Sequence, residues 1–281
     1  MGTRINGISI VTPKEYINYL KIDMSYHIEA INAFTDNYIW LLYDENSRHA
    51  LVVDPGDAGV VLNTVHSKQL QLTAVLITHH HYDHIGGLSK LVQHNPQLRI
   101  FGPRKESIAH VNVAVGEGDL VEASPSLPKL TAFDVPGHTA SHVAYHCDNN
   151  LFTGDTLFAA GCGRLLGGTA EQLFQSLQRI VQLDDNTRIY CAHEYTLANL
   201  KFAQAVEPAN ENVVSRLQKI EQMRANGRPS LPSTLAEEKL SNPFLRCDEQ
   251  SVIQAVQQYS GQQLSNASEV FRAMRSWKDQ F

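Results

Sequence analysis

The stretch LITHHHYDHIGG, residues 76–87, places four histidines and an aspartate within six residues, directly after an apolar run. The run AVLI that precedes the histidines is typical of a buried strand. Side chains alternate sides along an extended strand end, so His79 and His81 can converge on one point while His80 faces away. The stretch therefore predicts ligand side chains at the end of a strand.

The second half of this stretch adds Asp83 and His84 after the chain turns, where both can address a second point nearby. Imidazole and carboxylate groups together suit zinc, iron or manganese rather than calcium. The alternative is a loop of solvated histidines. A single histidine would favour that alternative, but an H-x-H-x-D-H pattern at a strand end favours a metal site.

Short β-rich runs bounded by Gly, Pro and Asp recur from Ile28 to about His193, and they are typical of buried strands. The main runs are IWLLYD, HALVVDPG, TAVLITHHH, LRIFGP, KLTAFDVPGHT, NNLFTGDTLF and TRIYCAHEY. Helical patterns lie between some of them, and Thr169 with Gln172 form a predicted capping box. Strands with interspersed helices predict a layered α/β domain.

After Tyr195 the apolar residues recur at helical spacing, and the breakers NGRPSLP and SNPF separate the helical pieces. We therefore expect three parts: an N-terminal extension over 1–23, a catalytic domain over 24–193, and a smaller α-helical domain over 194–281. The N-terminal stretch lacks the features of a secretory signal.

Charge and composition narrow the function. The chain has 281 residues and a net charge of −6. The part from residue 194 onward carries 10 basic and 10 acidic residues, so the whole negative charge lies in the first part. An acidic first part disfavours the binding of nucleic acid, which requires a basic surface, and favours the binding of divalent cations. No apolar stretch approaches the roughly 20 residues that span a bilayer. Four cysteines without C-x-x-C spacing are typical of reduced, partly buried thiols, so we expect a cytoplasmic protein. We also expect a monomer that contacts no membrane.

Three further polar residues follow apolar runs downstream: His138 in DVPGHT, Asp155 in FTGDTLF and His193 in IYCAHEYT. Taken alone, each histidine has an ordinary structural explanation, and Asp155 can cap a turn or a helix. Together with the first cluster they supply seven ligands. Seven are too many for one tetrahedral zinc but suit two metal ions that share a carboxylate.

These motifs resemble those of the metallo-β-lactamase superfamily. Within it, THHHYDHIGG, GHTASHVAYH, FTGDTLFAAGCGRLLGGT, CAHEYTLANLKFA and the closing MRSWKDQF closely resemble the glyoxalase II, or hydroxyacylglutathione hydrolase, family. The likeness runs from about Ile28 to Phe281. It implies a four-layer αββα sandwich with a C-terminal α-helical domain, and hydrolysis of S-(2-hydroxyacyl)glutathione, chiefly S-D-lactoylglutathione, to glutathione and D-lactate. This reaction is the second step of methylglyoxal detoxification.

The resemblance also implies a role for each of the seven ligands. One metal ion is assigned to His79, His81 and His138, the other to Asp83, His84 and His193, with Asp155 bridging the two. Zinc is the first expectation for both ions, and iron or manganese accept the same ligands. Two such ions lower the pKa of a bound water to about 7. The resulting hydroxide attacks the thioester carbonyl, and Asp83 is expected to orient it.

Substrate recognition is assigned mainly to the C-terminal part. Arg275 and Lys278 are three residues apart, so a helix places them on one face. Spacing alone favours a solvated charged face. The resemblance instead implies that they bind glutathione through its glycine carboxylate, and that Arg164 and Tyr195 make further glutathione contacts. Leu166 departs from the family pattern, which often has tyrosine there, so we expect one hydroxyl contact to be absent and affinity to be lower.

Three other functions compete with this hypothesis. A persulfide dioxygenase with a single iron would leave part of the second ligand set vacant. A nuclease of the same fold would need a basic surface or an added RNA-binding arm. A non-catalytic metal-binding module fits poorly, because seven ligands around two ions leave room for water.

Overall fold

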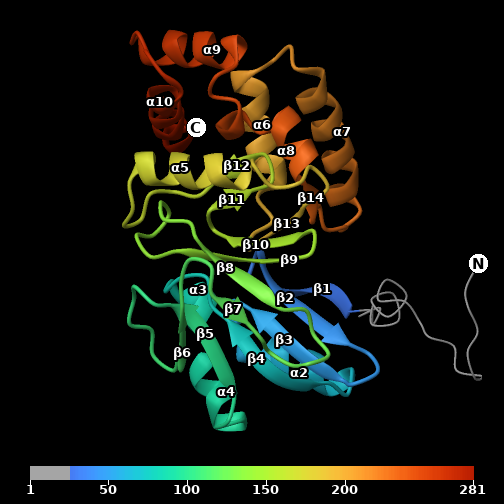
Figure 1. Cartoon of the computed structure of the whole chain (residues 1–281). Coiled ribbons are helices and arrows are strands. Elements are labelled where there is room, and N and C mark those ends of the chain that lie inside the picture. The colour runs from blue at the N-terminus through green and yellow to red at the C-terminus, as the bar shows by residue number, and fades with distance from the viewer. Residues whose placement is uncertain (1–25) are drawn as a thin grey trace, which may run out of the picture.

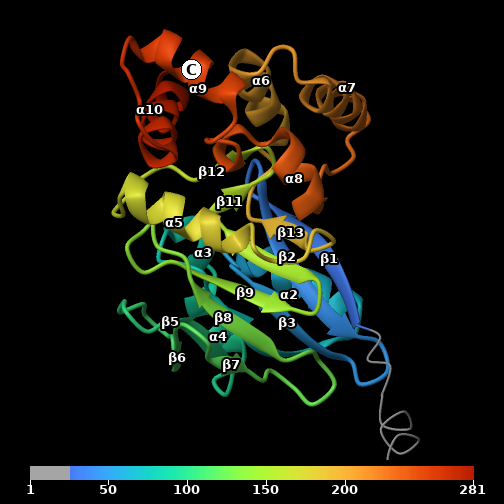
Figure 2. The same cartoon turned by 45° about the horizontal axis from the view of Figure 1, so that its top comes forward.

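The computed structural model describes residues 26–281 (Figures 1 and 2), so the expected extension over 1–23 lies outside the described residues. A first six-stranded sheet has the order β1-β2-β3-β4-β5-β6. Its strands pair antiparallel from β1 to β3 and parallel from β3 to β6. The strands are β1 (Tyr26–Ala33), β2 (Asn37–Asp44), β3 (His49–Val53), β4 (Gln71–Leu76), β5 (Arg99–Pro103) and β6 (Val113–Val115).

A second six-stranded sheet has the order β14-β13-β10-β9-β8-β7. Its one parallel pair is β10 with β13. The strands are β7 (Leu120–Val121), β8 (Leu130–Asp134), β9 (Val143–Cys147), β10 (Asn150–Gly154), β13 (Arg188–Cys191) and β14 (Ser233–Thr234). A separate hairpin consists of β11 (Leu157–Phe158) and β12 (Gly161–Cys162).

Helices cover the outer faces of both sheets, and most of them follow His193. The helices are α2 (Ala58–Ser67), α3 (Tyr82–Ile85), α4 (Leu88–His94), α5 (Ala170–Ile180), α6 (Thr196–Val206), α7 (Glu211–Ala225), α8 (Leu235–Ser241), α9 (Gln250–Ser260) and α10 (Ala267–Gln280), with a 3₁₀ turn at Pro243–Leu245. Figure 1 shows α6 to α10 gathered at one end of the molecule, with α5 between them and the sheets.

Successive side chains of β2 point to opposite faces of the first sheet, and both faces are covered. Tyr38, Trp40 and Leu42 face the second sheet, where they pack in one cluster with Tyr145 and Phe152. The intervening residues of β2 face outward and pack with apolar residues of α2 and α4. Because both faces are buried, the strand is a continuous apolar run rather than an alternating one.

The outer face of the second sheet buries its apolar residues against α5 and the C-terminal helices. Leu151 and Ile189 of the sheet share a cluster with Leu173 of α5 and Phe271 of α10. The order of layers is therefore helix, sheet, sheet, helix, which confirms the expected αββα sandwich with C-terminal helices. The predicted capping box on α5 is also confirmed, because Thr169 and Gln172 exchange both hydrogen bonds.

The C-terminal part contributes one element that the sequence did not predict. Strand β14 lies between α7 and α8 and pairs antiparallel with β13 at the edge of the second sheet. The backbone N–H of Leu235 also donates to the carbonyl of Thr187. The division at residues 193 and 194 stays a prediction, since the two parts share a sheet.

Two smaller expectations concern the cysteines and the membrane. All four cysteines are free and buried, as the absence of paired spacing predicted. Among residues 26–281, no helix combines the length and the apolar character that crossing a membrane requires.

Candidate active site

The seven predicted metal ligands lie at the ends of strands from both sheets. His79 and His81 follow β4, and α3 carries Asp83 and His84 one turn later. In the second sheet, His138 follows β8, Asp155 follows β10 and His193 follows β13. Because the two sheets face each other, these strand ends converge on one place. All seven side chains contribute to groups whose ligand atoms lie within 4.8 Å of one another.

His79, His81 and His138 form the first group, which we call the histidine group. His79 Nε2 and His138 Nε2 each lie 3.0 Å from His81 Nδ1. Two nitrogen ligands of a tetrahedral zinc ion lie about 3.3 Å apart, so the spacing of these atoms fits a shared ion.

The outer nitrogens of the histidine group are fixed by hydrogen bonds. His138 Nδ1 donates to the carbonyl of Arg164 at 2.8 Å. The hydroxyl of Thr78 donates to Asp54 at 2.7 Å, which leaves its oxygen free to accept from His79 Nδ1 at 3.0 Å. Both rings therefore present an unprotonated Nε2 toward His81, as metal-binding histidines do.

Asp83, His84 and His193 form the second group, which we call the aspartate group. Asp83 Oδ2 lies 3.3 Å from both His84 Nε2 and His193 Nε2. Behind these rings, His84 Nδ1 faces Asp54 at 3.0 Å and His193 Nδ1 faces Asp36 at 2.8 Å. Each ring of this group thus has a carboxylate on its far side.

Asp155 lies between the two groups. Its Oδ2 is 3.5 Å from His138 Nε2, whereas its Oδ1 is 3.5 Å from both His84 Nε2 and His193 Nε2. One carboxylate oxygen therefore faces each group. His79, His84 and Asp155 also lie within the same 4.8 Å, so the two groups are contiguous.

The electrostatics of the cluster favour cations. Burial alone would raise the pKa of Asp83 and of Asp155, but the neighbouring histidines outweigh it and hold both pKa values well below the ordinary range. Burial opposes protonation of His193, yet Asp155 and Asp83 raise its pKa to about 10. Burial lowers the pKa of His79, and the nearby histidines lower it further. The carboxylates of the cluster are thus ionised and His79 is neutral, whereas His193 holds a proton that a bound metal ion would displace.

Two buried atoms in the cluster lack any hydrogen-bond partner among the described residues: His84 Nε2 and Asp155 Oδ1. A buried polar atom without a partner is costly, and a metal ion would supply the missing partner. The donor set of imidazole and carboxylate groups is also the one that suits zinc, iron or manganese. The residues present therefore fit a divalent metal centre.

Sequence reasoning missed the carboxylates that support the cluster. It did not place Asp54 among the site residues, although its carboxylate accepts from the Thr78 N–H and faces His84. It gave no role to Asp36 or to Asn37, whose Nδ2 donates to Asp83 Oδ2 at 2.9 Å. The positive φ of Asp54 is the one local sign of an unusual position, and it is visible only in the structure.

Two further histidines, His80 and His142, lie outside the three groups of candidate ligands. His80 turns away from the cluster, and its Nδ1 pairs with Glu106 at 2.5 Å. His142 is fully buried and stacks on His79 with the ring centroids 4.7 Å apart. Its Nε2 accepts from the Asp155 N–H at 3.1 Å, so it supports the backbone at Asp155.

A cavity of about 520 Å³ opens beside the cluster, and all four predicted glutathione contacts line it. They come from distant segments: Arg164 follows β12, Tyr195 precedes α6, and both Arg275 and Lys278 lie on α10. Five of the seven candidate metal ligands line the same cavity, whereas His79 and His84 are buried behind it. Leu166, the residue that departs from the family pattern, lines the same cavity and is half exposed.

Arg275 and Lys278 do not form the solvated face that their spacing alone favoured. Arg275 is only 4 % exposed, and its Nη1 donates to the carbonyl of Cys162 at 3.0 Å. Its Nη2 donates to Asp279 at 3.0 Å. Lys278 is half-buried, and burial together with the charge of Arg275 lowers its pKa to about 8. Two cations held this close to each other favour an anionic ligand.

Tyr195 connects the substrate cavity to the metal cluster. Its ring stacks on His193 with centroids 4.7 Å apart and an interplanar angle of 7°. Phe158 meets both rings edge-on. Arg164 lies at the rim, largely exposed, and its Nε is 3.7 Å from Asp279. The cavity is thus aromatic near the cluster and cationic farther away.

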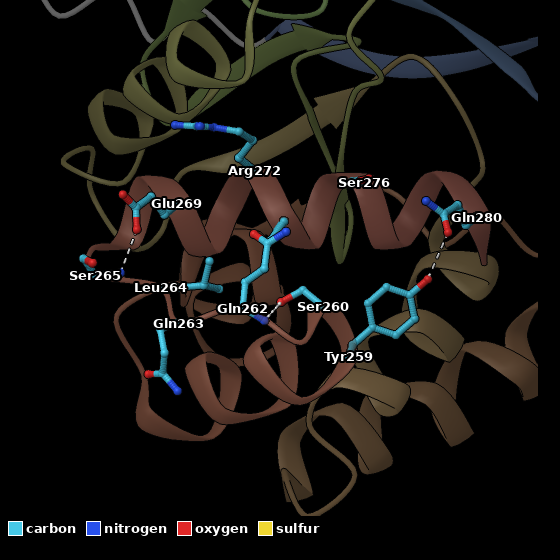
Figure 3. A pocket seen from close by; sticks show the side chains of 11 residues that line it. Tyr259, Ser260, Gln262, Gln263, Leu264, Ser265, Glu269, Arg272, Ser276 and Gln280 are labelled. Atoms are coloured by element: carbon cyan, nitrogen blue, oxygen red, sulfur yellow. Dashed lines mark hydrogen bonds between the residues drawn. The ribbon is translucent and has the colours of Figure 1, made fainter.

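A larger hollow of about 820 Å³ lies between α9, the following loop and α10 (Figure 3). Its lining is polar and includes Tyr259, Gln262, Glu269 and Arg272. None of the predicted site residues lines it. The volume of a cavity therefore does not identify the site. The smaller cavity is distinguished by the presence of Arg275 and Lys278 together with candidate metal ligands.

The fold and the cluster define a metallo-β-lactamase-type, metal-dependent hydrolase. The model of the metallo-beta-lactamase superfamily matches residues 34–193, and the model described as hydroxyacylglutathione hydrolase C-terminus matches residues 194–281. A hydroxyacylglutathione hydrolase from Nitrosomonas europaea is 47% identical over 251 residues, covering 89% of this chain and 95% of that protein. One from Aliivibrio salmonicida is 50% identical over 256 residues, covering 90% and 99%. The chain belongs to the hydroxyacylglutathione hydrolase family.

Solved structures agree on the fold. ETHE1 from Myxococcus xanthus superposes with a TM-score of 0.61 at 25% identity, over 90% of this chain and 98% of that chain. The B3 metallo-beta-lactamase BLEG-1 superposes with a TM-score of 0.59 at 20% identity, over 79% and 99%. The second likeness bears on the fold alone.

Proposed function

We propose that this chain hydrolyses S-(2-hydroxyacyl)glutathione, above all S-D-lactoylglutathione, to glutathione and a 2-hydroxy acid. One observation carries the proposal: a single cavity, lined by five of the seven candidate metal ligands, also contains the cations Arg275 and Lys278. Family membership supports the same reaction. Chemistry and recognition are then assigned to opposite ends of one cavity.

The metal ions are assigned to the two groups described above. The histidine group would hold one ion, the aspartate group the other, and Asp155 would bridge them. We propose zinc for both, because a mixed nitrogen and oxygen set suits zinc. When bound, two such ions supply a nucleophile from water at neutral pH and polarise the substrate carbonyl oxygen.

Asp83 is proposed to orient the attacking water. Its depressed pKa keeps the carboxylate ionised at neutral pH, so it can accept a hydrogen bond from water. Asn37 Nδ2 donates to Oδ2 of this carboxylate and restricts its rotation. Asp83 also lines the cavity, so it has access to both water and substrate.

Arg275, Lys278, Arg164 and Tyr195 are proposed to bind the glutathione part of the substrate. Glutathione carries carboxylates, and a half-buried Lys278 beside a buried Arg275 provides a partly desolvated cationic end for one of them. Arg164 at the rim adds a third cation. The thioester then extends past Tyr195 toward the cluster.

Metal analysis of the purified protein followed by S-D-lactoylglutathione hydrolysis tests this proposal. We expect about two metal ions per chain and thioester turnover in the metal-replete protein. Absence of turnover in metal-replete protein would overturn the proposal. One iron per chain, retained when Asp83, His84 and His193 are replaced by residues that cannot bind metal, would favour the single-iron persulfide dioxygenase.

A further inference from the structure

The hairpin of β11 and β12, residues 157–162, forms one wall of the substrate cavity. Phe158 and Cys162 line the cavity directly. The carbonyl of Cys162 accepts the hydrogen bond from Arg275 Nη1 at 3.0 Å. The position of this hairpin therefore decides where Arg275, a proposed glutathione contact, lies.

The turn of this hairpin has an unfavourable backbone conformation. Ala159 and Ala160 connect the two strands, and Ala160 has a φ of 54°. A residue with a Cβ rarely adopts this left-handed region unless the surroundings hold it there. Ala160 is also fully buried, so its backbone groups need partners from the protein.

Side chains from the C-terminal helices supply those partners. Asn242 Nδ2 donates to the carbonyls of Phe158 and Gly161, at 3.2 and 3.0 Å. The carboxylate of Glu238 accepts from the Ala160 N–H at 2.7 Å. Asn199 Nδ2 donates to the carbonyl of Ala159 at 3.0 Å. Four successive residues of the hairpin are thus each held by a side chain from beyond residue 193.

Glu238, which accepts from the Ala160 N–H, belongs to a buried ion pair. Glu238 is 0 % exposed, and Arg216 Nη2 on α7 donates to its other oxygen at 2.6 Å. A buried ion pair gives little net stability compared with apolar residues of the same size. Asn242 Nδ2 also lies 3.1 Å from Glu238 Oε2, so the carboxylate lies between α7 and the hairpin.

We infer that Glu238 and Asn242, with Asn199, are positioning residues that hold the hairpin of residues 157–162 and thereby set the affinity for the glutathione part of the substrate. The inference rests on the proposed function. Glu238 and Asn242 do not line the cavity, so they act only through the hairpin. Asn199 does line it, and the tests therefore use the other two residues.

Two double variants separate positioning from folding: R216M/E238Q and R216M/E238M. Both remove the buried ion pair, and the new side chains have similar volume, so both are expected to fold. Only the glutamine retains an oxygen that can accept from the Ala160 N–H. Wild-type turnover of S-D-lactoylglutathione is measured first, and its absence would count against the proposed function rather than against this inference.

We expect KM to be about tenfold higher in R216M/E238M than in R216M/E238Q, with equal metal content and kcat within about twofold. Equal KM values in the two variants would overturn the inference. Amide hydrogen exchange at Ala160 gives a second measurement in the wild type and in Asn242→Ala. We expect slow exchange that accelerates in the variant; an Ala160 amide that exchanges as fast as an exposed one would also overturn it.

Discussion

The metal cluster and the cationic end of the cavity are built in different ways. The candidate ligands are short side chains at strand ends, and most are buried and fixed by a second hydrogen bond. The cationic end uses two long side chains of α10, Arg275 and Lys278, which lie 82 and 85 positions (275 − 193 and 278 − 193) farther along the chain than His193. The ends of the strands position the candidate metal ligands. The packing of α10 against the hairpin of β11 and β12 positions Arg275, one of the two cations. Substitutions should therefore separate into effects on kcat and metal content and effects on KM.

The largest expected effect is at Asp155. Asp155→Asn removes the charge that faces both groups while keeping the shape of the side chain. We expect metal content to fall to about one ion per chain or less, and kcat to fall on the order of 10³-fold, since the two ions supply several kcal/mol. Elemental analysis and steady-state kinetics measure both. A fully metallated, active variant would refute a bridging role.

The next effect concerns the carboxylates behind the rings. Asp36→Asn keeps a hydrogen-bond acceptor for His193 Nδ1 but removes the charge. Loss of such a supporting group weakens metal binding about 10–100-fold, which competition with a chelator measures. His80→Ala is the matched control, because His80 adjoins the ligands in sequence but pairs with Glu106. If Asp36→Asn loses no more metal than His80→Ala, the charge of Asp36 behind the His193 ring does not contribute to metal binding.

At the other end of the cavity, Lys278→Ala should act on KM. We expect KM to rise about tenfold with kcat within about twofold, since a charge-assisted contact to the glutathione carboxylate is lost. Arg272→Ala, on the same helix but in the other hollow (Figure 3), is the control and should leave both parameters unchanged. An unchanged KM in Lys278→Ala would mean that Lys278 does not contact substrate.

The same lysine predicts a pH dependence. Burial and the charge of Arg275 lower the pKa of Lys278 to about 8, so its positive charge is present below that pH and is lost as the pH rises through it. The charged fraction falls about eightfold between about pH 7.5 and about pH 9, and kcat/KM should fall in parallel. In Lys278→Arg the side chain stays charged, so the decline should disappear from the pH profile. A decline of the same size in that variant would assign the titration to another group.

The smallest expected effect is at Leu166, which lines the cavity and is half exposed. Leu166→Tyr would add the hydroxyl that many family members have at this position. We expect KM to fall about two- to fivefold, the value of one partly exposed hydrogen bond. A KM that rises would show that this cavity is shaped for leucine.

Much of the site was predictable because its signals are local. H-x-H-x-D-H after a strand, and single ligands after later strands, identify candidate residues without any knowledge of packing. The structure brings all seven together, although their metal-binding roles stay predictions. The supporting carboxylate of Asp36 was not predictable, because it contacts a residue 157 positions away through a turn with no distinctive pattern. Glu238 was equally hidden, since its contact with Ala160 spans 78 positions.

The sequence by itself determined the layered α/β class, the α5 capping box and the family, and it supplied the candidate ligands. Periodicity gave the α/β class, and the resemblance carried by short motifs gave the family and the αββα order. Tertiary structure alone decided that Arg275 is buried rather than solvated, that β14 completes the second sheet, and that Glu238 accepts from the N–H of Ala160. The physical reason is that burial and pKa depend on which distant segments pack together, and spacing along the chain does not encode that.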